Sequence, residues 1–124
     1  MDFFTQLRLA NIARQTNEWD SDGKIDLSYD ALEFLTEAGE LGEQVKKLIR
    51  QMEGLAGNRT DMVKIEEEVG DVMITLDKLL TSIERRTGVR IDPIECTAKK
   101  FDKTSVKYGF KTHWNPDTWV KNPE

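Results

Sequence analysis

The chain has 124 residues, a length that suits one domain around one hydrophobic core. Charged residues make up 33% of it, above the roughly 25% of an average globular protein, which favours solvent-exposed helices over a thick sandwich of sheets. The formal net charge of −5 argues against bulk binding of nucleic acid, because contacts to the phosphate backbone need a basic surface.

The sequence contains no candidate for a membrane anchor. No stretch approaches the roughly 18 apolar residues of a membrane-spanning helix, and the N-terminal segment MDFFTQLRLANIARQ lacks the apolar run of a signal peptide. The single cysteine, Cys96, cannot form a disulfide within the chain, which fits a reducing compartment. We therefore expect a cytoplasmic protein that does not enter a membrane, with Cys96 buried as a small apolar residue.

Helical spacing and capping residues predict four helices joined by short loops. The expected ranges are about 3–18, 28–52, 60–87 and 93–108. The expected N-terminal caps are Asp2, Ser28, Thr60 and Asp92, and the expected stop of the third helix is Gly88. The loop of about seven residues between the second and third helices makes these two antiparallel neighbours.

Apolar residues follow the second and third helices at alternating steps of three and four, which is the spacing of a coiled-coil-like seam. The two series are Ala31, Phe34, Ala38, Leu41, Val45, Leu48 and Met52, and Met62, Ile65, Val69, Val72, Leu76, Leu79 and Ile83. One such hairpin cannot bury both of its faces. We therefore expect an all-α antiparallel bundle of four main helices, completed by dimerisation. Residues 1–109 are expected to form it, and residues 110–124 a tail that packs on the body or on a partner subunit.

Two acidic pairs repeat with the same offset of 31 residues as the apolar series. Glu37-Ala38-Gly39-Glu40 maps onto Glu68-Val69-Gly70-Asp71. The two acids of each pair lie about 60° apart on one flank of their helix, beside the apolar seam. On antiparallel neighbours these flanks can converge into one cluster of four carboxylates, with Glu37 and Glu68 nearest the seam. The glycine in each copy costs about 1 kcal/mol relative to alanine, which suggests close approach of a neighbouring backbone.

Four carboxylates held this close repel one another, and a bound cation would relieve the repulsion. An all-oxygen set suits Mg²⁺, or Mn²⁺, in octahedral coordination. Zinc is disfavoured because the only histidine, His113, lies in the tail. A single pair of acids three residues apart is common on solvated helices, so the metal interpretation depends on the pair being repeated. Glu37, Glu40, Glu68 and Asp71 are therefore the predicted metal ligands and catalytic residues.

The segments LTEAGELGEQ and EEEVGDVMITL resemble the two acidic motifs of the MazG-like, all-α nucleoside triphosphate pyrophosphohydrolases. The segment TGVRIDPIECTAKKFDKTSVKYG also resembles the region that follows these motifs in that family. The resemblance implies magnesium-dependent cleavage between the α and β phosphates of a nucleoside triphosphate, which yields a monophosphate and pyrophosphate. It also implies assembly as a homodimer or homotetramer.

Five further residues are candidates for contacts with such a substrate, and each has a structural alternative. Lys100 and Lys103 share one helical face and could bind the distal phosphates, or form a solvated basic face. Trp19 could stack on a nucleobase or anchor the core. Asn11 and Gln15 lie one helical turn apart and could read the edge of a base, or lie on the surface.

Two other functions remain open from the sequence. The chain could be a non-catalytic, dimeric helical interaction module whose acids only confer solubility. It could also be a related all-α nucleotidase that prefers diphosphates or a histidine-pathway substrate, which differs from the first hypothesis only in substrate.

Overall fold

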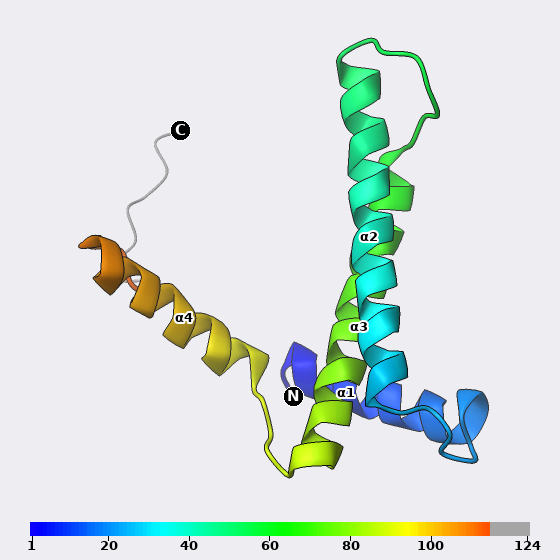
Figure 1. The fold of residues 1–124 in the computed structure, drawn as a ribbon, viewed down its shortest axis with the longest axis vertical. Coiled ribbons are helices and arrows are strands. Elements are labelled where there is room, and N and C mark those ends of the chain that lie inside the picture. Colours follow the sequence, from blue (N-terminus) through cyan, green and yellow to red (C-terminus); the bar gives the residue numbers. More distant parts are fainter. Residues whose placement is uncertain (115–124) are drawn as a thin grey trace. The chain divides into compact units, whose positions relative to one another are not determined.

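The structure, a computed structural model, describes residues 1–114 of the chain. Within this range the chain forms four α-helices and one π-helical turn, with no strands (Figure 1). The helices are α1 (Phe3–Arg14), α2 (Leu27–Met52), α3 (Met62–Thr87) and α4 (Pro93–Tyr108), and the π-helical turn η1 (Gln15–Trp19) directly follows α1. The predicted all-α fold class is confirmed.

The chain divides into two compact units, Met1–Arg90 and Ile91–Glu124. The first unit contains α1, η1 and the α2–α3 hairpin, and the second contains α4. Among the described residues, no helix combines the length and the apolar composition needed to cross a lipid bilayer.

Three of the predicted helix boundaries are confirmed by their capping contacts. Asp2 accepts the backbone N–H of Thr5 at 2.9 Å, and Asp92 accepts the N–H of Ile94 at 2.9 Å. Gly88 ends α3 in the left-handed region, at φ 73°, where a glycine carries no steric penalty.

The predicted caps Ser28 and Thr60 are wrong, because a nearby aspartate takes each role. Asp26 caps α2 by accepting the N–H of Tyr29, and Asp61 caps α3 by accepting the N–H of Lys64. An ionised carboxylate accepts a charge-assisted hydrogen bond from the backbone N–H, which is stronger than one to a neutral oxygen. Thr60 is buried, and its hydroxyl donates to Gln44 Oε1 at 2.5 Å instead.

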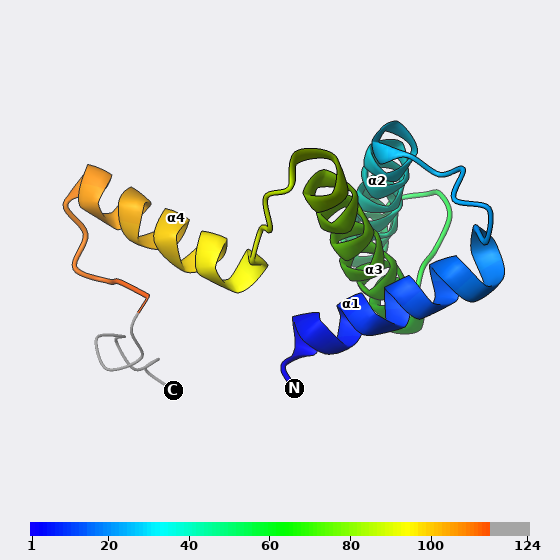
Figure 2. The same cartoon turned by 90° about the horizontal axis from the view of Figure 1, so that it is seen from below.

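The helices α2 and α3 lie side by side and antiparallel, and α1 crosses α3 near the end opposite the α2–α3 loop (Figures 1 and 2). Side-chain contacts fix the register of this hairpin. Lys78 Nζ lies 2.6 Å from Glu33 Oε1, and one turn further on Ser82 donates to the carboxylate of Asp30. The two helices therefore meet along a polar stripe as well as along the apolar seam.

The apolar seam is only partly covered within the described chain. Leu80 is the one buried apolar residue in this range. At the loop end of the hairpin, which α1 does not reach, Val45, Met52, Met62 and Val69 of the predicted seam are exposed. One chain therefore leaves part of its predicted core open to solvent.

Charged and amide groups hold α1 on α3. Asp77, with 2% of its surface exposed, accepts from Arg8 Nε at 2.9 Å and from Asn11 Nδ2 at 3.0 Å. Arg8 also pairs with Glu84 at 3.0 Å. Asp77 is thus a buried carboxylate whose charge is balanced by one arginine.

In the second unit, the start of the predicted tail packs on α4. Ser105 Oγ donates to the carbonyl of Thr112 at 2.5 Å, and the N–H of Trp114 donates to Asp102 at 2.6 Å. Cys96 is exposed, so its predicted burial is wrong: the described residues of this unit leave its side chain open to solvent. Residues 115–124 of the predicted tail lie outside the described residues.

Replacing Arg8 by alanine should lower the free energy of unfolding by about 3 kcal/mol, because it leaves the charge of Asp77 buried without its cation. Urea denaturation followed by circular dichroism measures the change. Lys46→Ala is the matched control, since Lys46 forms only an exposed ion pair with Glu43 and should change stability little. Equal losses in the two variants would contradict the importance of the Asp77 network.

Candidate functional site

Three of the four predicted carboxylates come together on the α2–α3 hairpin. Glu37 and Glu40 of α2 and Glu68 of α3 each offer an oxygen within 4.8 Å of the others, close enough to hold one metal ion. Asp71 lies outside this close group, but its charge acts on both Glu37 and Glu68. The four residues are called the acidic cluster below.

The acidic cluster has an inner and an outer part, as its position beside the seam predicts. Glu37 and Glu68 are half-buried, whereas Glu40 and Asp71 are exposed. The Oε2 atoms of Glu37 and Glu68 are both buried and have no hydrogen-bond partner. A buried polar atom without a partner is unfavourable, so the folded chain leaves these two oxygens unsatisfied.

The environment of the inner carboxylates opposes their ionisation. Burial raises the pKa of Glu37 to about 7, helped by the hydrogen bond that its protonated form donates to Glu40 and by the charges of Glu40, Asp71 and Glu68. Burial, and then mainly the charges of Glu40 and Asp71, also raises the pKa of Glu68. These four side chains therefore repel one another when all are ionised.

The described residues supply no counter-charge to the acidic cluster. Within residues 1–114, no lysine, arginine or histidine forms an ion pair with any of its four members. Glu33, one helical turn before Glu37 in α2, is by contrast paired with the cation of Lys78. Carboxylate oxygens from two helices, two of them unsatisfied, form a donor set that fits a hard divalent cation such as Mg²⁺.

Within the described chain, no other element packs closely against the glycines of the two motifs. A Cβ atom added at Gly39 or Gly70 would meet no atom within 4 Å. The expected close approach of a neighbouring helix is therefore absent within the described chain, since the acidic cluster and not the glycine face lies toward the partner helix.

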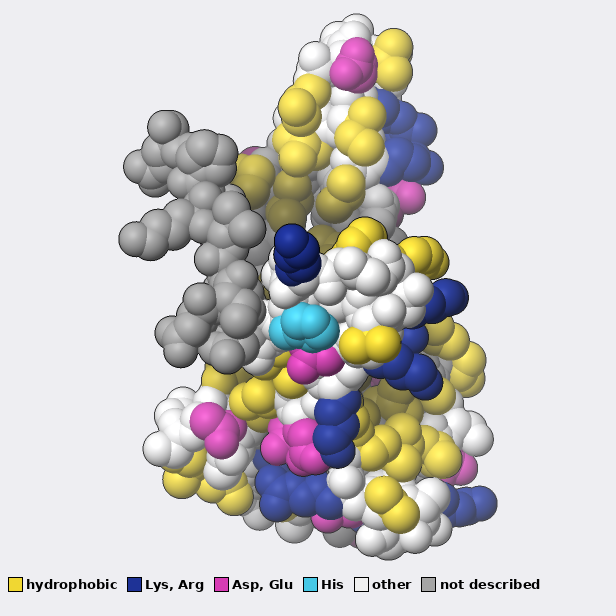
Figure 3. Space-filling model, turned by 90° about the vertical axis from the view of Figure 1, so that its left-hand side faces the viewer, with side chains coloured by type: hydrophobic (Ala, Val, Ile, Leu, Met, Phe, Trp, Pro, Cys, Tyr) yellow, Lys and Arg dark blue, Asp and Glu magenta, His cyan; other side chains and the backbone are white. Residues whose placement is uncertain are grey.

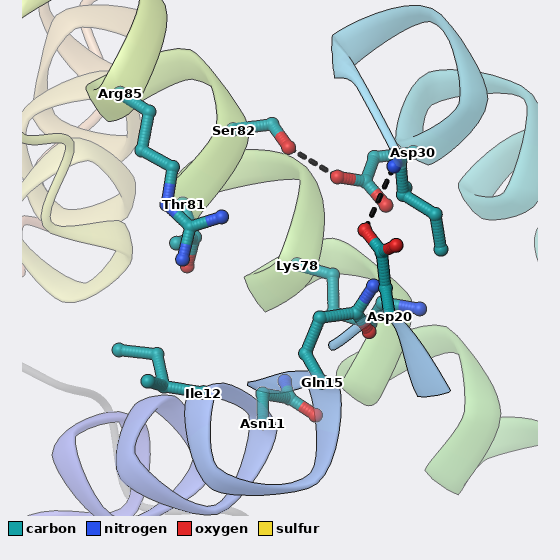
Figure 4. A pocket seen from close by; sticks show the side chains of 10 residues that line it. Asn11, Ile12, Gln15, Asp20, Asp30, Lys78, Thr81, Ser82 and Arg85 are labelled. Carbon is teal, nitrogen blue, oxygen red and sulfur yellow. Dashed lines mark hydrogen bonds between the residues drawn. The ribbon is translucent and has the colours of Figure 1, made fainter. Parts of the chain in front are cut away.

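A polar pocket lies beyond the Glu33–Lys78 pair, between η1, the start of α2 and the end of α3 (Figure 4). It is lined by Asn11, Ile12, Gln15, Asp20, Ile25, Asp30, Lys78, Thr81, Ser82 and Arg85. Two predicted substrate-binding residues, Asn11 and Gln15, are in this lining. Sequence reasoning missed Asp30, Lys78 and Ser82, although Asp30 precedes Glu37 by two helical turns on the same face.

The surroundings of Trp19 and Asn11, two predicted contacts of the base, limit the interactions that each can make. Trp19 is 60% exposed and therefore does not anchor the core, and the cations of Arg14 and Lys78 lie 4.7 and 5.1 Å from its ring centre. Asn11 is buried, and its amide nitrogen is already bound by the carbonyl of Ile74 and by Asp77. Only its amide oxygen remains for a ligand.

The predicted phosphate contacts, Lys100 and Lys103, are both exposed on α4 in the second unit. Lys100 lines an apolar pocket of that unit together with Phe101 and Phe110. Their predicted role in binding phosphate stays a prediction.

No family profile, characterised protein or solved structure matches this chain. The function must therefore be argued from its own residues.

The raised pKa values predict an unusual dependence of stability on pH. The folded state holds the proton of Glu37 more tightly than the unfolded state, so this contribution is full below pH 4.5 and is lost as pH rises through about 7. Without metal, the melting temperature should fall between pH 5 and pH 8, and Mg²⁺ should restore it more strongly at pH 8. A loss of 1 kcal/mol corresponds to about 4 °C, which differential scanning fluorimetry resolves.

Glu37→Gln should flatten this pH dependence, because the amide does not ionise. Glu66→Gln is the matched control, since Glu66 is an exposed acid on α3 outside the acidic cluster. A melting temperature that rises from pH 5 to pH 8 in the metal-free protein, or equal slopes in both variants, would refute the repulsion.

Proposed function

We propose that this protein hydrolyses a nucleoside triphosphate between its α and β phosphates, with Mg²⁺ held by the acidic cluster. The observation that carries the proposal is the pair of buried, unsatisfied carboxylate oxygens on Glu37 and Glu68, in a cluster to which residues 1–114 supply no cation. Mg²⁺ promotes many reactions. Among them, the resemblance of both acidic motifs to the MazG-like pyrophosphohydrolases supports this one.

Glu37, Glu40 and Glu68 would hold the cation, with Asp71 as the fourth acid beside them. Mg²⁺, or Mn²⁺ in its place, supplies neutralisation of phosphate charge and a lowered pKa of bound water when it is present. The exposed carboxylates of Glu40 and Asp71 are open to solvent. One of the carboxylates that is not used fully as a ligand can accept a proton from the attacking water.

The substrate would extend from the acidic cluster toward the polar pocket. Trp19 offers an exposed aromatic face beside Lys78, and Gln15 lines the pocket, so both are candidates for contacts with the base. Lys100 and Lys103 remain candidates for the distal phosphates.

We also propose that two copies of the chain associate through the loop end of the α2–α3 hairpin. Apolar side chains are exposed there on both helices: Val45, Ile49, Met52, Met62 and Val69. Figure 3 shows hydrophobic side chains open on this upper part of the hairpin. Exposed apolar side chains on two neighbouring helices favour a protein partner, and a second hairpin would extend the seam into a bundle. A cytoplasmic location is consistent with the exposed thiol of Cys96.

The activity is tested by pyrophosphate release from a panel of ribonucleoside and deoxyribonucleoside triphosphates with Mg²⁺, and by identification of the second product. Glu40→Ala and Asp71→Ala should each lower kcat/KM at least about 100-fold, because each removes a negative charge from the site that would hold the cation. Helicity should not change, because both side chains are exposed. Glu66→Ala should retain activity. No pyrophosphate from any member of the panel, and no stabilisation by Mg²⁺, would favour the non-catalytic interaction module instead.

The association is tested by light scattering after size exclusion. The native chain should have the mass of a dimer or of a larger even-numbered assembly, and Ile49→Lys should shift it to the mass of one chain, because a buried ammonium without a partner opposes assembly. Lys46→Gln, one turn away on α2, should leave the assembly intact. A monomeric native chain at micromolar concentration would contradict the proposed interface.

A further inference from the structure

The polar pocket contains a buried carboxylate, Asp30, of which one oxygen has no hydrogen-bond partner. Asp30 has 6% of its surface exposed. Its Oδ2 accepts the hydroxyl of Ser82, as drawn in Figure 4, whereas its Oδ1 is buried and has no hydrogen-bond partner. Within residues 1–114, Asp30 forms no ion pair: Lys78 is engaged by Glu33, and Arg85, which also lines the pocket, forms no ion pair with Asp30.

Two other polar side chains of the pocket, Asn11 and Asp20, offer no free donor to Asp30. The amide nitrogen of Asn11 is bound by two acceptors, which fixes the orientation of this amide and leaves its oxygen as the remaining polar atom. Asp20 is occupied by the backbone N–H groups of Lys24 and Ile25. At Asp30 and Asn11 the pocket therefore offers acceptors and needs a hydrogen-bond donor.

The size of the pocket limits which donor can enter. It encloses about 30 Å³, which is room for one or two groups the size of a water molecule and not for a whole nucleobase. An amino group at the edge of a base has this size, and the ring that carries it would lie in the open mouth of the pocket. Cytosine, adenine and guanine carry such an amino group, whereas uracil and thymine carry a carbonyl oxygen that the carboxylate would repel.

The position of Asp30 along α2 is consistent with a contact to the amino group of a base. It precedes Glu37 by seven residues on the same face of α2, a distance of about 10 Å along the helix. A nucleotide spans two helical turns from its α-phosphorus to the far edge of its base. A substrate with its α-phosphate at the acidic cluster would thus bring the amino edge of its base to Asp30.

We propose that Asp30 makes the protein selective for nucleotides whose base carries an exocyclic amino group, by accepting a hydrogen bond from that group at Oδ1. The proposal rests on the proposed nucleotide function. It assigns Asp30 the role of a specificity-determining residue.

The test uses nucleoside monophosphates, which are not turned over, with the full chain and Mg²⁺. The pair dCMP and dUMP differs only in an amino group against a carbonyl. The native protein should bind dCMP at least about tenfold more tightly than dUMP, the discrimination that one hydrogen bond to a charged group supplies. Titrations followed by NMR should move the side-chain amide signals of Asn11 and Gln15 with dCMP and much less with dUMP.

Asp30→Asn should bring the ratio of the two affinities close to one, because the amide also donates a hydrogen bond and so accommodates the carbonyl of uracil. Asp22→Asn is the matched control, since Asp22 is an exposed aspartate of the neighbouring loop and should keep the native ratio. Equal affinities of the native protein for dCMP and dUMP would overturn the proposal, and so would an unchanged ratio in Asp30→Asn. If this variant does not fold, the native ratio and the amide signals decide alone.

Two further experiments distinguish this proposal from a simple amine site and from a failure of the proposed function. Methylammonium that displaces dCMP at comparable concentration would show a simple amine site and would overturn the proposal. Pyrophosphate release is measured separately with dCTP and dUTP. Turnover of both at equal kcat/KM would leave the proposed function standing and overturn the role of Asp30, whereas selective binding of dCMP without any turnover would overturn the proposed function alone.

Discussion

The mutual repulsion of carboxylates gathered where α2 meets α3 is the constraint on which this account depends. The register of the hairpin makes the repulsion unavoidable. The same antiparallel alignment that sets Glu33 against Lys78 brings Glu37 and Glu40 to Glu68 one turn further along. At Glu33 the chain provides the cation of Lys78. At the acidic cluster it provides further carboxylates instead, and two buried oxygens stay unsatisfied. A partner with positive charge is the simplest way to stabilise that arrangement.

Much of the fold could be predicted from the sequence because its signals are local. The steps of three and four in the apolar residues specify the helices, and glycine in the left-handed region stops α3 at Gly88. The errors at Ser28 and Thr60 arose where two capping residues lie within two positions of each other. The choice then depends on contacts across the hairpin, such as that of Thr60 with Gln44, which no local pattern reveals.

The candidate site was predicted unevenly for a related reason. The acidic cluster could be found because the acidic motif occurs twice, with the same offset as the apolar series. Glu37 and Glu68 therefore hold equivalent positions on their two helices. The pocket at Asp30 has no such repeat. Its carboxylate meets Ser82, 52 residues away, and a single aspartate near a helix start is ordinarily read as a cap. At Gly39 and Gly70 the expected close approach is not found within the described chain, because the conformational cost of a helical glycine does not tell which molecule approaches it.

The most direct test of the central claim is a crystal structure of the full chain grown with Mn²⁺ in place of Mg²⁺, with anomalous differences measured at the manganese edge. We expect an anomalous peak among the carboxylates of Glu37, Glu40 and Glu68, which would place a bound cation at their buried oxygens. Ordered side chains at these three residues without a peak, at a manganese concentration in the millimolar range, would contradict it.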